Sequence, residues 1–365
     1  MIEWRDCILG DLVTFQRGHD LPKSKMNGGK YPVVGSNGII GHHDKYTTEA
    51  PSITVGRSGN VGKPFIYYGK SWSHNTSLYI KDFKGNDPIF IYYFLQTLDL
   101  ENYAGGSAVP TLNRNHVHSL NVSVPRKVNV QKKIGETLKL IDDKINTNEK
   151  INENLFQQLH VLYLRLFCDS AMDTPLGDVV ATTSGGTPSR KHDEYYSDSS
   201  ICWVKSKELL GNYIHETEEH INDLAIKKSS AKLLPEHSVL IAMYGATVGA
   251  YGVISKPMTC NQAVCALLCN ENYPYTYLFQ IAYESQQKFI NLAVGSAQQN
   301  ISQVLIKQLN LHSDLDIIQK FHGFALSMHK EIESLQAENM RLSALRDNLL
   351  PKLMSGELDV SNIDL

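Results

Sequence analysis

Two long stretches of the chain carry apolar side chains at alternating steps of four and three residues. The first stretch covers residues 134–166 and the second covers residues 317–353. This heptad spacing predicts two helices of about 40 residues, each roughly 60 Å long, that pack on each other as a coiled coil. Such lengths exceed what a small globular domain covers, which favours mutual packing over two ordinary amphipathic surface helices.

Each predicted helix has an asparagine near the middle of its apolar seam. An amide in an apolar seam penalises slipped pairings, so Asn148 or Asn152 is expected to meet Asn339 and fix the register. Pro351 is expected to stop the second helix, and the first is expected to end near Phe167. The seam positions are Ile134, Leu138, Ile141, Ile145, Asn148, Asn152, Leu155, Leu159, Leu162 and Leu166, then Ile317, Phe321, Phe324, Met328, Ile332, Leu335, Asn339, Leu342, Leu345, Leu349 and Leu353.

The segments that precede the two helices repeat the same landmarks in the same order, which indicates an internal repeat. The second segment carries insertions of about twenty residues, which loops tolerate well. Between landmarks the similarity is weak, so we expect one scaffold with two different surfaces. The paired landmarks are Leu9-Gly10-Asp11 with Leu176-Gly177-Asp178, Gly56–Gly62 with Tyr244–Gly249, His74-Asn75-Thr76-Ser77 with Cys260-Asn261-Gln262-Ala263, Gly106-Ser107-Ala108 with Gly295-Ser296-Ala297, Leu120-Asn121-Val122 with Leu309-Asn310-Leu311, and Gln131-Lys132 with Gln319-Lys320.

Within each segment, short β-branched runs alternate with loops rich in glycine, asparagine and serine, which is typical of mixed α and β structure. The fold class is therefore α+β, with a pseudo-two-fold repeat. Antiparallel pairing of the helices would place the two segments at opposite ends of one rod. The predicted strands are 52–55, 63–68, 78–80, 239–243, 252–254 and 263–268, and the predicted helices of the segments are 88–98 and 274–290.

The charge is uneven along the chain, although the net charge is only −3. Residues 1–172 hold 20 Lys/Arg against 16 Asp/Glu, and residues 173–365 hold 15 against 22. Phosphate contacts supply much of the affinity for DNA, so the chain alone should bind duplex DNA weakly. The start lacks an apolar signal core and no apolar run is long enough to span a membrane, so we expect a cytoplasmic protein without membrane contact.

Several segments resemble catalytic or metal-binding motifs, but each departs from its motif at a residue that the chemistry needs or lies where another explanation is better. Gly56–Lys63 resembles a phosphate loop, but Pro64 stands where a Ser or Thr must bind magnesium. Asp142-Asp143-Lys144 lies on the first predicted helix and is expected to be a solvated face. Cys260, Cys265 and Cys269 lack paired CxxC spacing, which favours free core thiols over a metal site. The sequence predicts a recognition protein without catalytic or metal-binding residues of its own.

Several polar loops have the composition of nucleic-acid contacts. Gly185–Lys191 combines flexible backbone with hydroxyl, guanidinium and ammonium donors, and Arg57–Asn60 offers a guanidinium for guanine and an amide for adenine. Either loop is equally readable as a solvated turn. Gln298-Gln299-Asn300 and Asn113-Arg114-Asn115 are expected to occupy equivalent places in the repeat, which favours recognition.

Taken in order, these features resemble the specificity (S) subunit of type I restriction-modification enzymes over essentially the whole chain. One departure is that Gly186-Thr187-Pro188-Ser189 is clear only in the second segment, where the first has Arg17–Pro22. The motifs that carry the resemblance are the two Leu-Gly-Asp openings, the Gly-Thr-Pro-Ser loop, the two Gly-Ser-Ala segments, the Gln-Lys helix starts, and the close Leu349-Leu350-Pro351-Lys352-Leu353-Met354-Ser355-Gly356-Glu357-Leu358.

The resemblance implies two target-recognition domains, each reading one half of an asymmetric bipartite site in double-stranded DNA. The helices set the spacing and dock two adenine-N6 methylation subunits, and two restriction subunits join them. S-adenosylmethionine, ATP and magnesium are expected only in those partners. The implied division is 1–125 for the first domain, 126–172 for the central helix, 173–311 for the second domain, 312–358 for the distal helix and 359–365 for the tail.

The residues expected to contact DNA combine the loop analysis with this resemblance. Positions around Lys139–Asn152 and Lys330–Arg346 are expected to carry the methylation subunits. Two alternatives remain open: a specificity subunit of a type II restriction-methylation system, and a coiled-coil scaffold whose globular ends bind proteins. The expected DNA-contacting residues are Arg57, Asn60, Asn75 and Arg114, then Thr187, Arg190, Tyr244, Asn261, Gln298 and Asn300.

Overall fold

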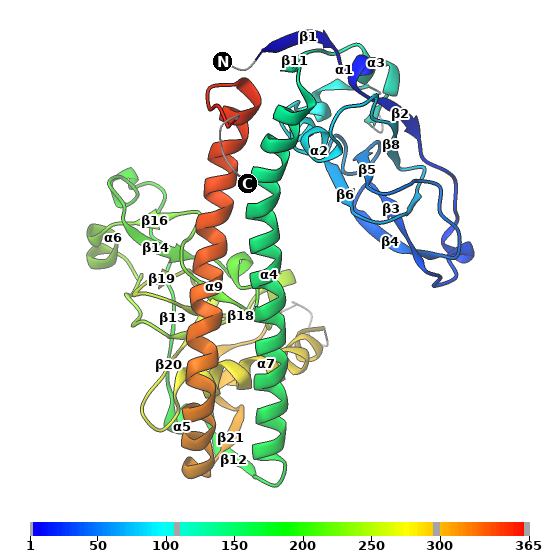
Figure 1. The fold of residues 1–365 in the computed structure, drawn as a ribbon. Helices are drawn as coiled ribbons and strands as arrows, with labels where there is room; N and C mark the ends of the chain where they lie inside the picture. Colours follow the sequence, from blue (N-terminus) through cyan, green and yellow to red (C-terminus); the bar gives the residue numbers. More distant parts are fainter. Residues whose placement is uncertain (1–2, 106–109, 295–299, 361–365) are drawn as a thin grey trace. The chain divides into compact units, whose positions relative to one another are not determined.

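The computed structural model describes residues 3–105, 110–294 and 300–360. The chain forms two compact units: unit 1 comprises residues 1–146 and 341–365, and unit 2 comprises residues 147–340. Two long helices, α4 (Val128–Phe167) and α9 (Leu315–Ser355), each contribute a segment to both units (Figure 1). Within the described residues, neither these helices nor any other is long and apolar enough to cross a membrane.

Unit 1 combines a four-stranded and a three-stranded sheet with short helices and two small strand pairs. Its first and last strands pair antiparallel, from Trp4 opposite Pro125 to Ile8 opposite Asn121. In sheet order, the elements are β2 (Thr14–Arg17), β8 (Ser77–Asp82), β5 (Ser52–Gly56) and β6 (Pro64–Tyr67); β4 (Gly38–His43), β3 (Tyr31–Gly35) and β7 (Trp72–Ser73); β1 (Trp4–Ile8) with β11 (Asn121–Pro125); β9 (Ala104–Gly105) with β10 (Thr111–Leu112); and helices α1 (Leu9–Leu12), α2 (Pro88–Gln96) and α3 (Arg114–His118).

Unit 2 repeats this plan with a longer helix, α7 (Tyr275–Val294), in the place of α2, and with an added helix, α6 (Asp223–Lys228). It also has an added strand, β15 (Tyr213–Ile214), which pairs parallel with β18 (Tyr251–Ile254). In sheet order, the elements are β13 (Ala181–Ser184), β20 (Val264–Leu268), β17 (Val239–Ala242), β18 (Tyr251–Ile254) and β15 (Tyr213–Ile214); β16 (His220–Ile221), β14 (Ile201–Val204) and β19 (Thr259–Cys260); β12 (Met172–Pro175) with β21 (Asn310–His312); and helices α5 (Leu176–Val179), α6 (Asp223–Lys228), α7 (Tyr275–Val294) and α8 (Gln303–Lys307). The repeat and the α+β class predicted from sequence are confirmed, and each predicted strand overlaps an observed one.

In each unit the segments of α4 and α9 pack antiparallel. In unit 2 the Asn148 amide donates to Asn339 Oδ1 at 2.8 Å, and the ring centroids of Phe167 and Phe321 lie 5.9 Å apart at the other end of the pair. In unit 1 the core around Ile134 and Leu138 also contains Leu353 and Met354. Asn148, rather than Asn152, is therefore the partner of Asn339. Every predicted seam position on α4 is buried or half-buried, which confirms that face.

On α9 the predicted seam is wrong at two positions. Phe324 is 56% exposed and Leu345 is 47% exposed. The buried face instead passes through Ala325 and His329, a small residue and a polar one that an apolar pattern does not reveal.

Pro351 does not stop the second helix, because α9 continues to Ser355. The helix ends where Gly356 adopts a φ of +79°, a backbone conformation that favours glycine and is common just past a helix C-terminus.

His329 is a buried polar residue of unit 2 whose ring lies beside Tyr213, Tyr275 and Phe279. The Tyr213 hydroxyl and His329 Nδ1 are 2.9 Å apart. Burial, aided by the charges of His322 and His237, lowers the pKa of His329 to about 3. The folded chain therefore keeps this imidazole neutral at a pH where the unfolded chain protonates it.

We expect the stability of the protein to fall as the pH drops below about 6.5, because only the unfolded state then takes up a proton at His329. The loss is at most about 1.4 kcal/mol per pH unit and continues until the pH approaches the folded pKa. Chemical denaturation between pH 8 and pH 5 measures it, with pH values chosen to bracket an ordinary histidine pKa of about 6.5. His329→Gln should flatten this dependence, whereas the surface substitution His42→Gln should not; equal slopes in all three proteins would contradict the assignment.

Candidate nucleic-acid interface

In each unit the loop that follows the second strand lies against the turn that precedes the strand paired with it. A Cβ on Gly18 would sit 2.0 Å from the His74 carbonyl oxygen, and a Cβ on Gly185 would sit 2.4 Å from the Asn261 carbonyl oxygen and 2.1 Å from that of Cys260. Both approaches are too close for any side chain, so glycine is required at both positions. The Gly18 and Gly185 loops are therefore equivalent, and the apparent departure of the first segment from the Gly-Thr-Pro-Ser pattern is one of side chains, not of backbone.

Main-chain hydrogen bonds fix how the two turns correspond. His74 N–H donates to the Val34 carbonyl at 2.8 Å, and Asn261 N–H donates to the Val204 carbonyl at 2.9 Å. In the parallel pairs, Val34 stands opposite Ser73 and Val204 stands opposite Cys260. His74 is thus equivalent to Asn261, and the pairing of these turns from sequence is wrong by one residue.

After this correction, Asn75 corresponds to Gln262, and the two amides make equivalent contacts. The Asn75 amide donates to Asp20 Oδ1 in unit 1, and the Thr187 hydroxyl donates to Gln262 Oε1 in unit 2. All four side chains are exposed or half-buried. Each unit therefore ties its glycine loop to its turn through one surface amide, although the partners differ in charge. Asp20 and Gln262 were not predicted from the sequence, which pointed instead to Asn75, Thr187 and Asn261.

Arg57 occupies the position that Met243 holds in unit 2. Arg57 N–H donates to Thr76 O at 2.8 Å, and its carbonyl accepts from Leu112 at 2.9 Å. Met243 N–H donates to Ala263 O at 2.8 Å, and its carbonyl accepts from Ile301 at 2.9 Å. A half-buried guanidinium in one unit thus replaces a buried thioether in the other.

The same bonds make Asn300 equivalent to Thr111, because Ile301 is equivalent to Leu112. The expected match of residues 298–300 with Asn113–Asn115 is therefore wrong by four positions, because it set Asn300 opposite Asn115. Gln298 itself lies outside the described residues.

Arg57 and Arg114 line one cavity of about 530 Å³ in unit 1, together with Arg17 and His116. No acidic residue of the described chain lines it, although Arg17 Nη2 lies 3.4 Å from Asp20 on the exposed side. Three guanidiniums around a small cavity suit a phosphate or the acceptor edge of guanine. Asn60 does not reach this cavity: it sits in the tight turn after Gly59, which has a φ of +83°.

In unit 2 the expected contact residues form two separate groups. Arg190 pairs with Glu219 and stacks on aromatic rings, with its guanidinium carbon 4.3 Å from the Tyr196 centroid. The hydrogen bond from Lys205, with that from Arg190, lowers the pKa of Glu219 and keeps it ionised. Arg190 is therefore held in one orientation by its neighbours.

The second group consists of Tyr244 and Asn300, which form an isolated β-bridge. Asn300 Oδ1 accepts from Gly245 N–H at 3.4 Å, and Tyr244 is 42% exposed. Asn261 has a structural task in the turn, because its Oδ1 accepts from Ala263 N–H at 3.1 Å. The tyrosine ring and the amide of this group are thus available at the surface together.

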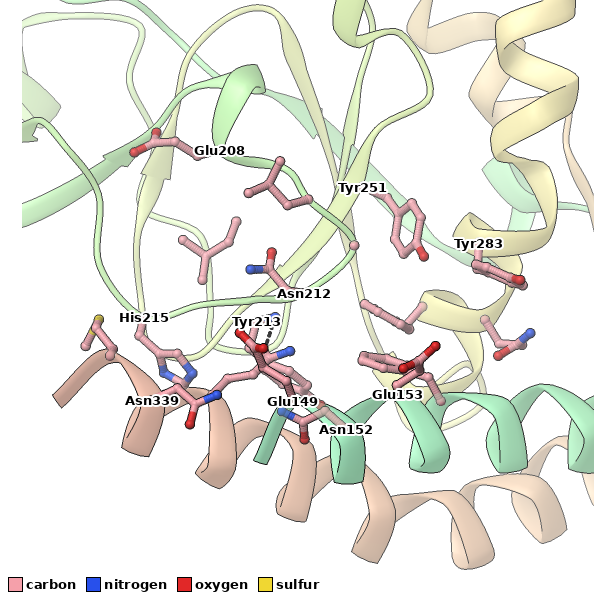
Figure 2. A pocket seen from close by; sticks show the side chains of 18 of the residues that line it. Glu149, Asn152, Glu153, Glu208, Asn212, Tyr213, His215, Tyr251, Tyr283 and Asn339 are labelled. Atoms are coloured by element: carbon pink, nitrogen blue, oxygen red, sulfur yellow. Dashed lines mark hydrogen bonds between the residues drawn. The ribbon is translucent and has the colours of Figure 1, made fainter. Parts of the chain in front are cut away.

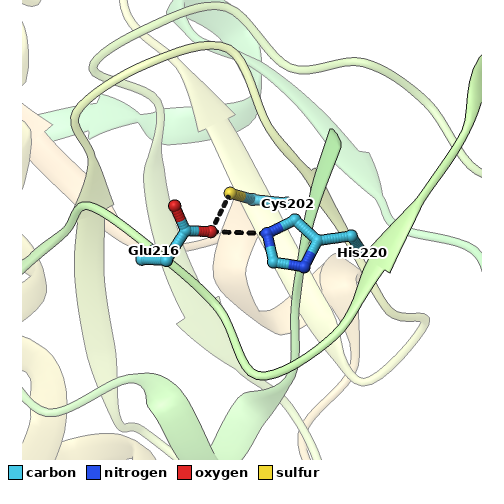
Figure 3. Close-up of side chains that lie close together, drawn as sticks. All are labelled: Cys202, Glu216 and His220. Carbon is cyan, nitrogen blue, oxygen red and sulfur yellow. Dashed lines mark hydrogen bonds and ion pairs between the residues drawn. The ribbon is translucent and has the colours of Figure 1, made fainter. Parts of the chain in front are cut away.

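Among the described residues, one group of side chains has the composition of a metal site: Cys202, Glu216 and His220 (Figure 3). Cys202 on β14 stands directly opposite His220 on β16. The Cys202 thiol lies 3.0 Å from Glu216 Oε1, and His220 Nε2 lies 2.5 Å from the same oxygen. Lys256 Nζ lies 3.2 Å from the other carboxylate oxygen. Partial burial would raise the pKa of Glu216, but these hydrogen bonds outweigh it and hold the pKa at about 2. Lys256 already supplies a positive charge beside the carboxylate of Glu216. Hydrogen bonds and this ion pair therefore account for the way these side chains are grouped.

Cys260 and Cys265 are fully buried, and burial raises the pKa of each thiol to about 12. A thiol that holds its proton this firmly is a poor metal ligand, because metals bind the thiolate.

The fold thus defines a protein built from two variants of one loop-bearing recognition unit and two long helices. A family profile described as "Type I restriction modification DNA specificity domain" matches residues 1–157 and again residues 171–332. The chain belongs to this family.

Named relatives and a solved structure agree with this membership. The specificity subunit of the type I restriction enzyme MjaIX from Methanocaldococcus jannaschii is 25% identical over 310 residues, which cover 75% of this chain and 70% of the relative. That of HindI from Haemophilus influenzae is 26% identical over 188 residues, 50% of this chain and 40% of the relative. The crystal structure of a type I restriction-modification S subunit from M. genitalium has the same fold, with a TM-score of 0.68 and 17% identity over 96% of both chains.

We expect Gly185→Ala to destabilise unit 2 by roughly 2 kcal/mol or more, because its Cβ has no space beside the Cys260 carbonyl. Gly323→Ala is the matched control, since a Cβ there meets nothing within 4 Å and lies in α9. It should stabilise the protein by up to about 1 kcal/mol. Thermal unfolding of both variants measures the difference; equal melting temperatures would contradict the close approach of loop and turn.

Proposed function

We propose that this chain is the DNA-sequence-specificity subunit of a type I restriction-modification complex. Each unit reads one half of an asymmetric bipartite site in duplex DNA, and the paired helices carry two adenine-N6 methylation subunits. Restriction subunits, also two, join the same assembly. The chain performs no chemistry: S-adenosylmethionine, ATP and magnesium act in the partner subunits.

The observation that carries this proposal is that the two units share the same main-chain contacts but carry different side chains at equivalent positions. The two units hold loop and turn with the same hydrogen bonds, but Arg57 stands where unit 2 has Met243, and Asp20–Asn75 stands where unit 2 has Thr187–Gln262. Base edges are read by side chains, while the backbone of a protein only positions them. Two like scaffolds with unlike side chains suit two different half-sites.

The electrostatics support a reader that works inside a larger assembly. The cavity lined by Arg17, Arg57 and Arg114 offers positive charge on unit 1, whereas residues 173–365 have an excess of seven acidic groups. A chain with this charge distribution is expected to bind DNA weakly on its own at physiological salt. Partner subunits that close around the DNA supply the further phosphate contacts. Each relative named above belongs to a type I system, so neither the type II alternative nor the protein-binding scaffold has an observation in its favour.

Co-expression with the methylation subunit encoded beside this chain tests the proposal. N6-methyladenine is then mapped across the host genome by single-molecule sequencing. The expected result is a split motif, with two short specific halves around a fixed unspecified gap. Methylation at a continuous motif, or a stable complex that methylates no site, would contradict the proposal.

Arg57→Met places in unit 1 the residue that unit 2 carries at the equivalent position, so the fold should be retained. We expect the complex to assemble but to lose about 1–3 kcal/mol of discrimination at one base pair, because a bidentate guanidinium contact is removed. The methylated motif should relax in one half only. Arg126→Met is the control, since Arg126 is an exposed arginine that pairs with Glu3 at 2.8 Å; an unchanged motif in Arg57→Met would exclude Arg57 from base reading.

A further inference from the structure

Unit 2 contains a cavity of about 760 Å³ at the place where its globular part meets the long helices. One wall comes from α4, which contributes Glu149, Asn152 and Glu153 (Figure 2). Phe156 also lines the cavity and shares their face of the helix by its spacing. The opposite wall is the turn of residues 210–216. Tyr213, Tyr251 and Phe279 are buried and give the cavity an aromatic lining, while Tyr283 is half exposed.

The amides, hydroxyls and histidines that line this cavity include hydrogen-bond donors, but four of its acceptor groups have no partner within the described chain. Glu149 and Glu153 are exposed and form no hydrogen bond or ion pair with the described part of the chain. Asn152 is only 6% exposed, and its side-chain oxygen is buried without a hydrogen-bond partner. The side-chain oxygen of Asn212 is also buried and has no hydrogen-bond partner. No lysine or arginine of the described residues lines the cavity.

A buried acceptor without a donor costs roughly 1–3 kcal/mol, so these oxygens are expected to gain a partner on binding. The ligand must therefore bring hydrogen-bond donors and positive charge. DNA is excluded as the occupant, because unpaired carboxylates repel phosphates.

We propose that this cavity is a docking site for an arginine side chain of the methylation subunit. The proposal rests on the function proposed above and names the contact through which unit 2 holds that partner. A guanidinium has five donors in a planar fork, which matches several carboxylate and amide oxygens at once, and it stacks on tyrosine rings. An ammonium group has three donors and no plane to stack.

The size and the rim of the cavity indicate a protein segment around that arginine. The volume exceeds one side chain, and Leu210, which is 75% exposed, lies at the edge with Met340. A buried cationic anchor surrounded by apolar contacts that exclude water is the usual composition of an interface hot spot.

Glu153→Arg tests the site in the full chain, by titrating the purified methylation subunit and measuring the dissociation constant. We expect affinity to fall by roughly tenfold or more, since a like charge replaces the carboxylate that pairs with the guanidinium. Glu271→Arg is the matched control, an equal charge reversal at an exposed position of unit 2 outside the cavity and outside the helix segments expected to carry the methylation subunits, and should bind as the unmodified chain does. Equal affinity of all three proteins, or an equal loss in both variants, would overturn the proposal.

A photo-crosslinking amino acid at position 210 identifies the segment that enters. The expected product is a peptide of the methylation subunit that contains an arginine, and changing that arginine to glutamate should restore binding to Glu153→Arg. Crosslinks to DNA, or to a peptide without arginine, would refute the site while leaving the specificity function intact. Failure of the unmodified chain to bind the methylation subunit would instead overturn both.

Discussion

The close contact between a glycine loop and a strand-end turn is the constraint on which both units depend. Gly18 and Gly185 each approach a carbonyl oxygen so closely that no Cβ fits, and the main chain beyond each glycine bonds to the neighbouring strand and turn. This contact costs the chain its freedom to vary at those positions. In return, the side chains on either side of the glycine, such as Arg17 and Thr187, emerge from a backbone of fixed direction. A surface built in this way can change its chemistry without changing its shape.

The helices supply a second constraint, which is polar instead of steric. Asn148 Nδ2 donates to both Glu338 Oε2 and Asn339 Oδ1 in a mainly apolar seam, so a slip by one turn would leave these groups buried and unpaired. In unit 1 the half-buried pair of Arg346 with Asp142, at 2.8 Å, has the same effect. Asp142 also accepts from the Tyr93 hydroxyl at 2.5 Å, which joins the helix register to α2. Asp142, which was expected to lie on a solvated face, is therefore half-buried in the packing of the helix against the domain, and that expectation is wrong for this residue.

Much of the fold could be predicted from the sequence because hydrophobic period and repeated landmarks are local signals. The heptads gave both helices, and Leu9-Gly10-Asp11 with Leu176-Gly177-Asp178 placed the start of each unit. The failures have physical causes. Ala325 and His329 occupy the seam because a small side chain and a neutral, hydrogen-bonded imidazole pack as well as leucine does. The turn alignment was off by one because residue identity favoured Asn75 with Asn261, whereas main-chain bonds equate Asn75 with Gln262.

The candidate site shows the same division between what sequence carries and what it does not. Arg57 and Arg114 were found from composition, but their meeting in one cavity with Arg17 depends on the packing of segments far apart in the chain. Unit 2 has Met243 at the position of Arg57, and a buried thioether cannot contact DNA as a guanidinium does. Base reading by unit 2 must then rely on other groups, of which the exposed Tyr244–Asn300 pair and the oriented Arg190 have suitable donors. The two units are therefore expected to read their half-sites by different chemistry and not by two versions of one contact.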